Sequence, residues 1–364
     1  MIAYRKLQTH RMLLVAVGLG ALAALPGWSQ EVPAQSPVAS VPRIGARLHA
    51  ADLGLVINTA DADSVLVGAH YIEARGLAPS QVLRLPVPRK PVLSRAEFEA
   101  LRLAIEAYFG RDIQALALAW TQPFAVECNS ITGALALGFD AELCKNSCGA
   151  SRASRYYNSP SPHPLSTLGW RPSMLLAARS PEQAMAMIDR GVAADGSLAL
   201  RGRPPVTALL LATSDAPRRV RMALYPPSGL LKGPGVELRI GPESELAAAR
   251  RVLLVITGSV RVALDPAPDW VAGGLGDHLT SNGGDLAGAH GQSTVLDWIE
   301  SGATASHGAV SEPCNHLQKF PHPQLLLGHY LQGATAIEAY WKSVAWPQQS
   351  LFVGEPLAAP FALR

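Results

Sequence analysis

Fifteen residues near the C-terminal end combine several side chains that could do chemistry. Residues 302–316 read GATASHGAVSEPCNH and hold two histidines, a glutamate, a cysteine and two serines. A serine or cysteine nucleophile requires a base within hydrogen-bond reach, and histidine is the usual base. The segment therefore indicates a hydrolase with Ser306 or Cys314 as nucleophile. His307 inside the segment, or His278 before it, would be the base.

Each nucleophile departs from the pattern that would mark it as catalytic. Ser306 lies in TASHG, where Thr304 replaces the first glycine of the Gly-x-Ser-x-Gly elbow. Cys314 follows Glu312, and a neighbouring carboxylate disfavours a thiolate. Asp277 could orient a histidine, but the sequence does not show which one.

Other chemistries have weaker support. Three histidines, His316, His322 and His329, share a region with Glu312, but they lack the helical spacing of known metal sites. The glycine-rich stretch GGLGDHLTSNGG matches neither a dinucleotide fingerprint nor a phosphate-binding loop. The sequence therefore predicts no metal and no cofactor.

The chain has four cysteines, Cys128, Cys144, Cys148 and Cys314. An even number of cysteines in an exported protein predicts disulfides, and four cysteines allow three pairings. We expect Cys144–Cys148 as a local loop and Cys128–Cys314 as a long-range bond. A zinc site at the Cys-x3-Cys pair is the alternative.

The N-terminus has the pattern of a secretory signal peptide over residues 1–29. Three basic residues precede or begin an apolar run that is short for a bilayer span. An uncleaved anchor is the alternative, and no further transmembrane segment is expected. Removing residues 1–29 reduces the 31 basic residues by three, which leaves them equal to the 28 acidic residues. The predicted product is a periplasmic or secreted protein that does not bind nucleic acid.

Residues 30–48 are rich in Pro, Ser and Ala and predict a linker. After them, apolar runs alternate with helical patterns, which indicates an α/β fold with a mostly parallel sheet and helices on both faces. We expect a single domain over 49–364, with a disulfide-linked insertion at about 121–170; a split near residue 170 is the alternative. The expected strands are 53–58, 81–85, 113–120, 173–178, 205–214, 250–259 and 269–279. The expected helices are 64–76, 94–109, 180–191, 291–302 and 335–344. Ser94 with Glu97 predicts a capping box at the start of 94–109, and Ser180 is the expected N-cap of 180–191.

Polar side chains that follow strands are the candidates for a ligand-binding cleft. The carboxyl ends of parallel strands share one edge of a sheet, where ligands bind in open α/β folds. The predicted cleft residues are Asn58, Asp61, Asp277, Ser281, Asn282 and Glu312.

Several segments together resemble an uncharacterised family of exported bacterial proteins. They include LVINTADADSVLVGAHYIEARGL, GDHLTSNGG, GATASHGAVSEPCN, IEAYWKSVAWPQQ and FVGEPLAAPF, and the resemblance covers most of residues 53–362. That family is defined by its sequence pattern, so the resemblance implies export and supplies no activity.

A more distant likeness is to the caspase-like cysteine peptidases of the gingipain type. In that family one strand leads to a catalytic histidine and a later strand ends at a catalytic cysteine. The matching positions here fall at Ser281 or Asn282 and at Ser306 or His307, and neither required residue stands there. The likeness implies a caspase-like sheet without the peptidase dyad.

The resulting hypothesis is a non-catalytic or degenerate peptidase-like domain that binds a small ligand or a protein partner at the carboxyl-end cleft. The alternative is a peptidase or esterase with a non-standard site around His278, Ser306, His307 and Cys314.

Overall fold

The structure is a computed structural model that describes residues 46–199 and 204–363. The predicted signal peptide and all but the last residues of the predicted linker lie outside the described residues. The described part of the chain belongs to one compact unit that begins at residue 39. In this part, no helix has both the length and the apolar character needed to cross a bilayer.

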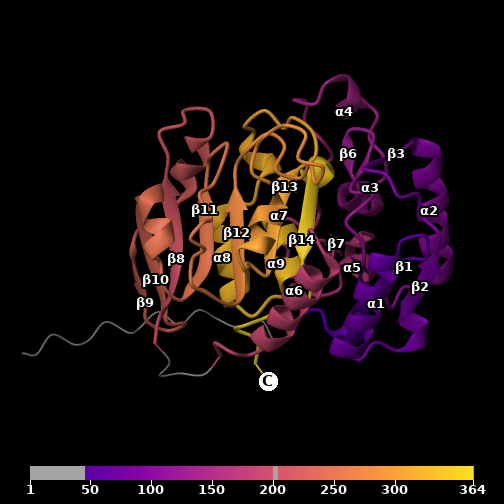
Figure 1. Ribbon diagram of the computed structural model, residues 1–364, viewed down its shortest axis with the longest axis horizontal. Coiled ribbons are helices and arrows are strands. Elements are labelled where there is room, and N and C mark those ends of the chain that lie inside the picture. Colours follow the sequence, from indigo (N-terminus) through magenta and orange to yellow (C-terminus); the bar gives the residue numbers. More distant parts are fainter. Residues whose placement is uncertain (1–45, 200–203, 364) are drawn as a thin grey trace, which may run out of the picture. The chain divides into compact units, whose positions relative to one another are not determined.

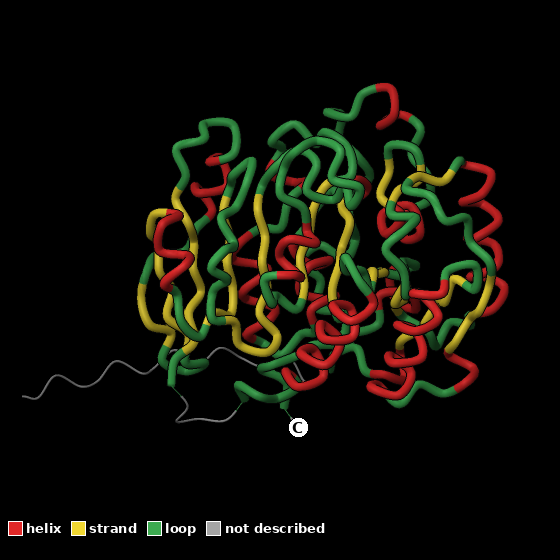
Figure 2. Tube along the Cα trace, viewed as in Figure 1, coloured by secondary structure: helices red, strands yellow, loops and turns green. Residues whose placement is uncertain are grey.

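The centre of the fold is an 11-stranded sheet (Figures 1 and 2). In spatial order its strands are β2 (Val82–Leu85), β1 (Leu53–Asn58), β4 (Ala115–Leu118), β7 (Ser173–Leu175), β14 (Ser350–Gly354), β13 (Ala305–Ala309), β12 (Trp270–His278), β11 (Val252–Thr257), β8 (Val206–Ala212), β10 (Val236–Pro242) and β9 (Gly229–Leu231). Most neighbours pair in parallel, whereas β9 is antiparallel to β10 and β14 is antiparallel to β13. A small second sheet contains β3 (Val92–Leu93), β5 (Ala125–Val126) and β6 (Asn129–Ser130).

The predicted α/β class with a mostly parallel sheet is confirmed. Every residue of β1, β4 and β11 is buried, as expected for strands covered on both faces. Within β1, Ile57 packs against Gly68 of the first helix, whereas Gly54 packs against Phe109 and Ile113. Because side chains alternate along a strand, these contacts place helical segments on opposite faces of the sheet.

Nine α-helices are present among the described residues. They are α1 (Ala62–Arg75), α2 (Arg95–Tyr108), α3 (Ile131–Leu137), α4 (Glu142–Lys145), α5 (Pro164–Leu168), α6 (Pro181–Ala194), α7 (Val295–Glu300), α8 (Pro323–Leu331) and α9 (Ala336–Ser343). Short 3-10 turns are η1 (Ala50–Asp52), η2 (Pro79–Gln81), η3 (Arg219–Leu224), η4 (Glu243–Ala248), η5 (Leu317–Lys319) and η6 (Pro347–Gln349).

Local signals in the sequence account for several helix ends. The predicted capping box at the start of α2 is confirmed, since Ser94 Oγ accepts from Glu97 N at 3.4 Å and Ser94 N donates to the Glu97 carboxylate at 2.8 Å. Ser180 caps α6 by accepting from Gln183 N. Gly76 ends α1 with a φ of 63°, a conformation that favours glycine.

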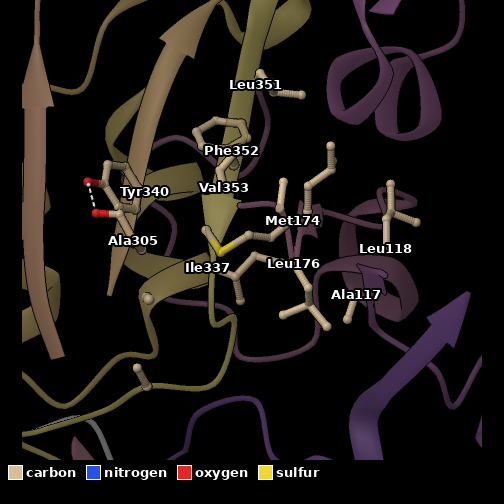
Figure 3. Close-up of a cluster of buried hydrophobic side chains, with 14 of the residues drawn as sticks. Ala117, Leu118, Met174, Leu176, Ala305, Ile337, Tyr340, Leu351, Phe352 and Val353 are labelled. Carbon is tan, nitrogen blue, oxygen red and sulfur yellow. Dashed lines mark hydrogen bonds between the residues drawn. The ribbon is translucent and has the colours of Figure 1, made fainter. Parts of the chain in front are cut away.

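Helix α9 anchors the middle of the sheet. Its Trp341 stacks on Phe352 of β14 at 4.7 Å between ring centroids and donates to the Ser173 carbonyl of β7 at 3.0 Å. The Tyr340 hydroxyl lies 3.3 Å from the Ala305 carbonyl oxygen on β13, to which it donates (Figure 3). It also lies 3.1 Å from the Gly276 carbonyl oxygen on β12. One short helix therefore connects β7, β12, β13 and β14, and Trp341 is buried in the core.

The predicted cysteine pairing is wrong, although two disulfides are present. The bonds are Cys128–Cys144 and Cys148–Cys314, which span 16 and 166 residues. Cys148 follows the end of α4, where the chain turns towards the loop after β13, so it reaches Cys314 and not Cys144. The second bond thereby joins the segment 121–170 to the C-terminal half of the chain.

Several elements were not predicted from the sequence, including the short strands and helices within residues 121–170 and three elements of the C-terminal half. β10 carries exposed side chains at alternate positions, β14 is a five-residue strand inserted between β7 and β13, and α8 follows a His-Pro turn. The predicted helix 291–302 is also shorter, because Thr294 caps α7 and residues before it form loop.

Candidate functional site

Two strand ends bring ionisable side chains together at the carboxyl edge of β12 and β13. The parallel register pairs Asp277 with His307, so their side chains lie on the same face. Because β14 runs antiparallel to β13, its first residue, Ser350, lies at that same edge opposite Ala309. Turn η3 supplies Arg221, which follows the carboxyl end of β8.

The four side chains form a continuous network. His307 Nδ1 lies 3.2 Å from Asp277 Oδ2, and His307 Nε2 lies 2.9 Å from Ser350 Oγ. Arg221 pairs with the other oxygen of Asp277 and donates to the Thr257 carbonyl at 2.7 Å. Burial by itself would raise the pKa of Asp277, but Arg221 and His307 hold the pKa below its usual value.

This network has the Ser-His-Asp order of a hydrolase triad, yet all four residues are buried, at no more than 1% exposure. The Phe320 ring lies 6.1 Å from the His307 ring and separates it from a cleft of about 180 Å³. A reacting group would need to displace Phe320 before it reached Ser350. The geometry holds a charge pair and a polar hydrogen bond inside the fold.

The structure assigns His278 to the core. Its Nδ1 accepts from Trp298 Nε1 at 2.9 Å, and its Nε2 lies 3.0 Å from the Ser293 carbonyl, to which it donates. Burial lowers the pKa of His278 to about 4. Both ring nitrogens are therefore occupied, and neither is available to a nucleophile.

The two predicted nucleophiles are not brought to a histidine base. Ser306 lies on the face of β13 opposite His307, and within the described residues its buried hydroxyl has no hydrogen-bond partner. Its strand neighbour Gly276 packs under the Trp298 ring. Cys314 is bonded to Cys148 and so has no free thiol.

The predicted cleft residues do not converge on one cleft. Asn58 organises the turn after β1, since its side chain accepts from Ala60 N and Val87 N and donates to the Val87 carbonyl. Asp277 belongs to the buried network. Ser281 and Glu312 line the small cleft next to Phe320. The Asn282 backbone donates to Gln292 in the loop after β12.

Asp61 lines a larger cleft of about 570 Å³ at the carboxyl ends of β1, β4 and β7. In the strand order β2-β1-β4, the chain runs from β1 to β2 on one side and then to β4 on the other side of β1. Ligands of open α/β sheets bind at such a switch point. Its lining includes Asp61, Asp63, Ser64, Val67, Arg89, Trp120, Thr121, Gln122, Leu176, Arg179, Ser180, Leu286 and Leu296.

The cleft lining holds two carboxylates, Asp61 and Asp63, and two guanidinium groups, Arg89 and Arg179. Asp61 caps α1 and lies 3.5 Å from Arg89. Arg179 is already paired with Asp297 at 2.5 Å and Glu300 at 2.9 Å. Among the residues that the structure describes, the Asp63 carboxylate has no ion pair, and no three acidic, histidine or cysteine side chains converge as a metal site would require.

Sequence reasoning missed several residues of both sites. Arg179 directly follows a predicted strand, so its position was a usable signal for the larger cleft. Ser350 and Arg221 had no such signal, because β14 and η3 were not predicted. Their contacts with His307 and Asp277 join residues that are 43 and 56 positions apart.

Comparison with known proteins finds few similar chains. No protein-family model matches, and no curated protein matches. The predicted exported bacterial family is therefore not confirmed. Two solved structures are similar. The Arg-specific cysteine proteinase gingipain R aligns at a TM-score of 0.47 and 11% identity, covering 88% of this chain and 80% of that one. A structure titled "Structure of Protease" aligns at 0.42 and 10%, covering 85% and 78%.

Proposed function

We propose that this chain is an exported protein that binds a small cationic ligand in the cleft at the carboxyl ends of β1, β4 and β7. The observation that carries the proposal is the cleft itself, about 570 Å³ at the switch point of the sheet. This volume lies within the range of small-molecule sites, and the position is the usual one for ligands of open α/β sheets.

The charges around the cleft support a cationic ligand. Arg89 is offset by Asp61, and Arg179 is offset by both Asp297 and Glu300. Asp63 has no cation among the described residues, so an ammonium or guanidinium group on a ligand would supply one. Val67, Trp120 and Leu176 offer apolar surface for a short aliphatic body.

The positions of the reactive groups favour binding over catalysis. Ser306 is buried on the face away from His307, Cys314 is in a disulfide, and both nitrogens of His278 are hydrogen-bonded. The two disulfides are typical of oxidising compartments, which supports export to the periplasm or beyond.

Thermal unfolding with candidate ligands tests this proposal. Agmatine and putrescine supply cations, and glutarate supplies a matched dianion. We expect the cations to raise the Tm of the wild-type protein and of Asp112→Asn, which removes an exposed carboxylate outside the cleft. We expect no such increase for Asp63→Asn. The proposal fails if glutarate stabilises the protein as well as the cations do, or if the cations stabilise Asp63→Asn fully.

A serine hydrolase is the second candidate function, because Ser350, His307 and Asp277 are lined up at 2.9 and 3.2 Å. In this candidate His307 is still the base, as predicted, and Ser350 is the nucleophile in place of Ser306 or Cys314. Labelling with a fluorophosphonate probe shows whether Ser350 or Ser306 reacts. Labelling that is lost in Ser350→Ala and kept in Ser306→Ala would support a hydrolase with Ser350 as nucleophile. Absence of labelling in the folded wild-type protein would exclude Ser350 as an accessible nucleophile.

A further inference from the structure

A third cavity, of about 710 Å³, lies away from the cleft of the proposed function and is lined by residues of α2, α3, α5 and β4 and the loops next to them. We propose that this cavity binds an amphipathic monocarboxylate, that is, a carboxylic acid with an aliphatic or aromatic body. The inference goes beyond the proposed function and does not depend on it, because it concerns a different site and a ligand of the opposite charge.

The floor of the cavity is apolar. Ile105, Phe109 and Leu116 belong to the buried core, and Leu135 and Leu165 are partly exposed on the short helices α3 and α5. Apolar walls with a few polar groups at the rim are the usual composition of a small-molecule site. The body of the ligand would cover these side chains and remove their exposed surface from water.

The rim carries an excess of positive charge. Arg102 is fully offset, since it pairs with Glu99 at 2.9 Å and Glu106 at 2.6 Å. Arg111 and Arg171 form no ion pair with any described carboxylate within 4.0 Å. Three guanidinium groups and two carboxylates give the rim a net charge of +1, and a single carboxylate on a ligand would neutralise it.

Arg171 is held in place by backbone carbonyl groups. Its Nε donates to Ile113 at 2.9 Å, and its Nη2 donates to Gly110 at 2.8 Å. Burial lowers the pKa of Arg171, although Glu106 acts in the opposite direction. Among the described residues its Nη1 has no hydrogen-bond partner, so this fixed, partly desolvated guanidinium can donate from Nη1 to a ligand carboxylate.

Three glycines line the cavity and leave it open. A Cβ atom at Gly110, Gly138 or Gly169 would meet no atom within 4 Å. Gly138 and Gly169 have φ values of 82° and 76°, so side chains there would strain the backbone. Gly110 is not in this conformation and has room for a Cβ atom, so we chose Gly110→Val as the substitution to narrow the cavity.

Calorimetric titration of the mature protein with three ten-carbon probes tests the inference. Decanoate carries the predicted anion, decylamine a cation and decanol no charge, each kept below its micelle concentration. Arg111→Gln removes one guanidinium. Among the described residues, the Arg111 side chain forms a single hydrogen bond, to the Ser166 carbonyl at 3.3 Å. Arg84→Gln removes an exposed arginine of β2 and is the matched control.

We expect decanoate to bind the wild-type protein and Arg84→Gln equally, and to bind Arg111→Gln roughly tenfold more weakly, as the loss of a charge-assisted hydrogen bond predicts. Gly110→Val should also weaken decanoate binding. The inference is overturned if decanoate does not bind, if decanol or decylamine binds as tightly, or if both cavity variants bind decanoate like the wild type. Circular dichroism of each variant shows whether it is folded.

Discussion

At the scale of single residues, histidines that looked catalytic serve the core. His278 bridges Trp298 and the Ser293 carbonyl, and His307 bridges Asp277 and Ser350. Both ring nitrogens of His278 form hydrogen bonds, and this histidine stabilises the fold in its neutral form. The residue types that suggested a hydrolase are therefore equally suited to satisfying buried polar groups where three strands meet.

His278 makes the stability of the protein sensitive to acid. Its pKa falls from 6.5 to about 4 on folding, so the unfolded chain binds a proton first as the pH drops. The contribution of neutral His278 to the free energy of unfolding is complete above pH 6.5. As the pH falls towards 4, up to roughly 3 kcal/mol of it is lost. Urea unfolding at pH 7 and pH 4.5 measures this loss.

His278→Gln retains one acceptor and one donor but does not titrate. We expect it to lose less stability between pH 7 and pH 4.5 than the wild type does. His163→Gln, at an exposed histidine, should behave like the wild type. An unchanged pH dependence in His278→Gln would contradict the assignment of this titration to His278.

At the scale of elements, strand β14 and the loops around it determine what the C-terminal half can do. β14 enters between β7 and β13 and places Ser350 beside His307. The loop after β13 is tied through Cys148–Cys314 to the end of α4. The same disulfide fixes one wall of the small cleft next to Phe320, since Cys314 is part of its lining.

The two disulfides should stabilise the fold unequally. The Cys128–Cys144 bond spans 16 residues and Cys148–Cys314 spans 166. Because a longer loop removes more entropy from the unfolded chain, the loss of Cys148–Cys314 should cost about 2 kcal/mol more. Denaturant unfolding of the two double Cys→Ser variants measures the difference. A larger cost for the short-range bond would contradict this ordering.

At the scale of the whole described molecule, a buried ion cluster connects distant parts of the chain. Arg75 of α1 binds Glu355 after β14 through two nitrogens, and Asp195 after α6 at 2.5 Å. Tyr71 donates to Glu355 at 2.8 Å. Burial by itself would lower the pKa of Arg75, but Glu355 raises it. The cluster holds α1 and α6 against the C-terminal segment.

Glu355→Gln should destabilise the protein by roughly 3 kcal/mol, because it leaves the Arg75 charge buried with less compensation. Glu142→Gln is the matched control, since it breaks the pair with Lys145 in which both side chains are more than 70% exposed. We expect no measurable change for this control. Chemical denaturation of both variants checks the comparison, and equal effects would show that the cluster contributes no more than a surface pair.

The sequence by itself determined the features that depend on neighbouring residues. Apolar runs such as 53–58 and 250–259 identified buried strands, and the Ser94 and Ser180 caps identified helix starts, since backbone pairing and capping act within a few positions. It also placed Asp61 and Asp277 at strand ends, where loops of a parallel sheet meet.

Only the tertiary structure decided which of these residues meet. The cysteine pairs, the contact of Ser350 with His307 and the contact of Arg221 with Asp277 join distant positions. They depend on how the sheet orders its strands, above all on where β14 enters. Many different strand orders would place the same residue types at strand ends. The packing of the whole sheet, and not the local sequence pattern, therefore selects which of these residues contact each other.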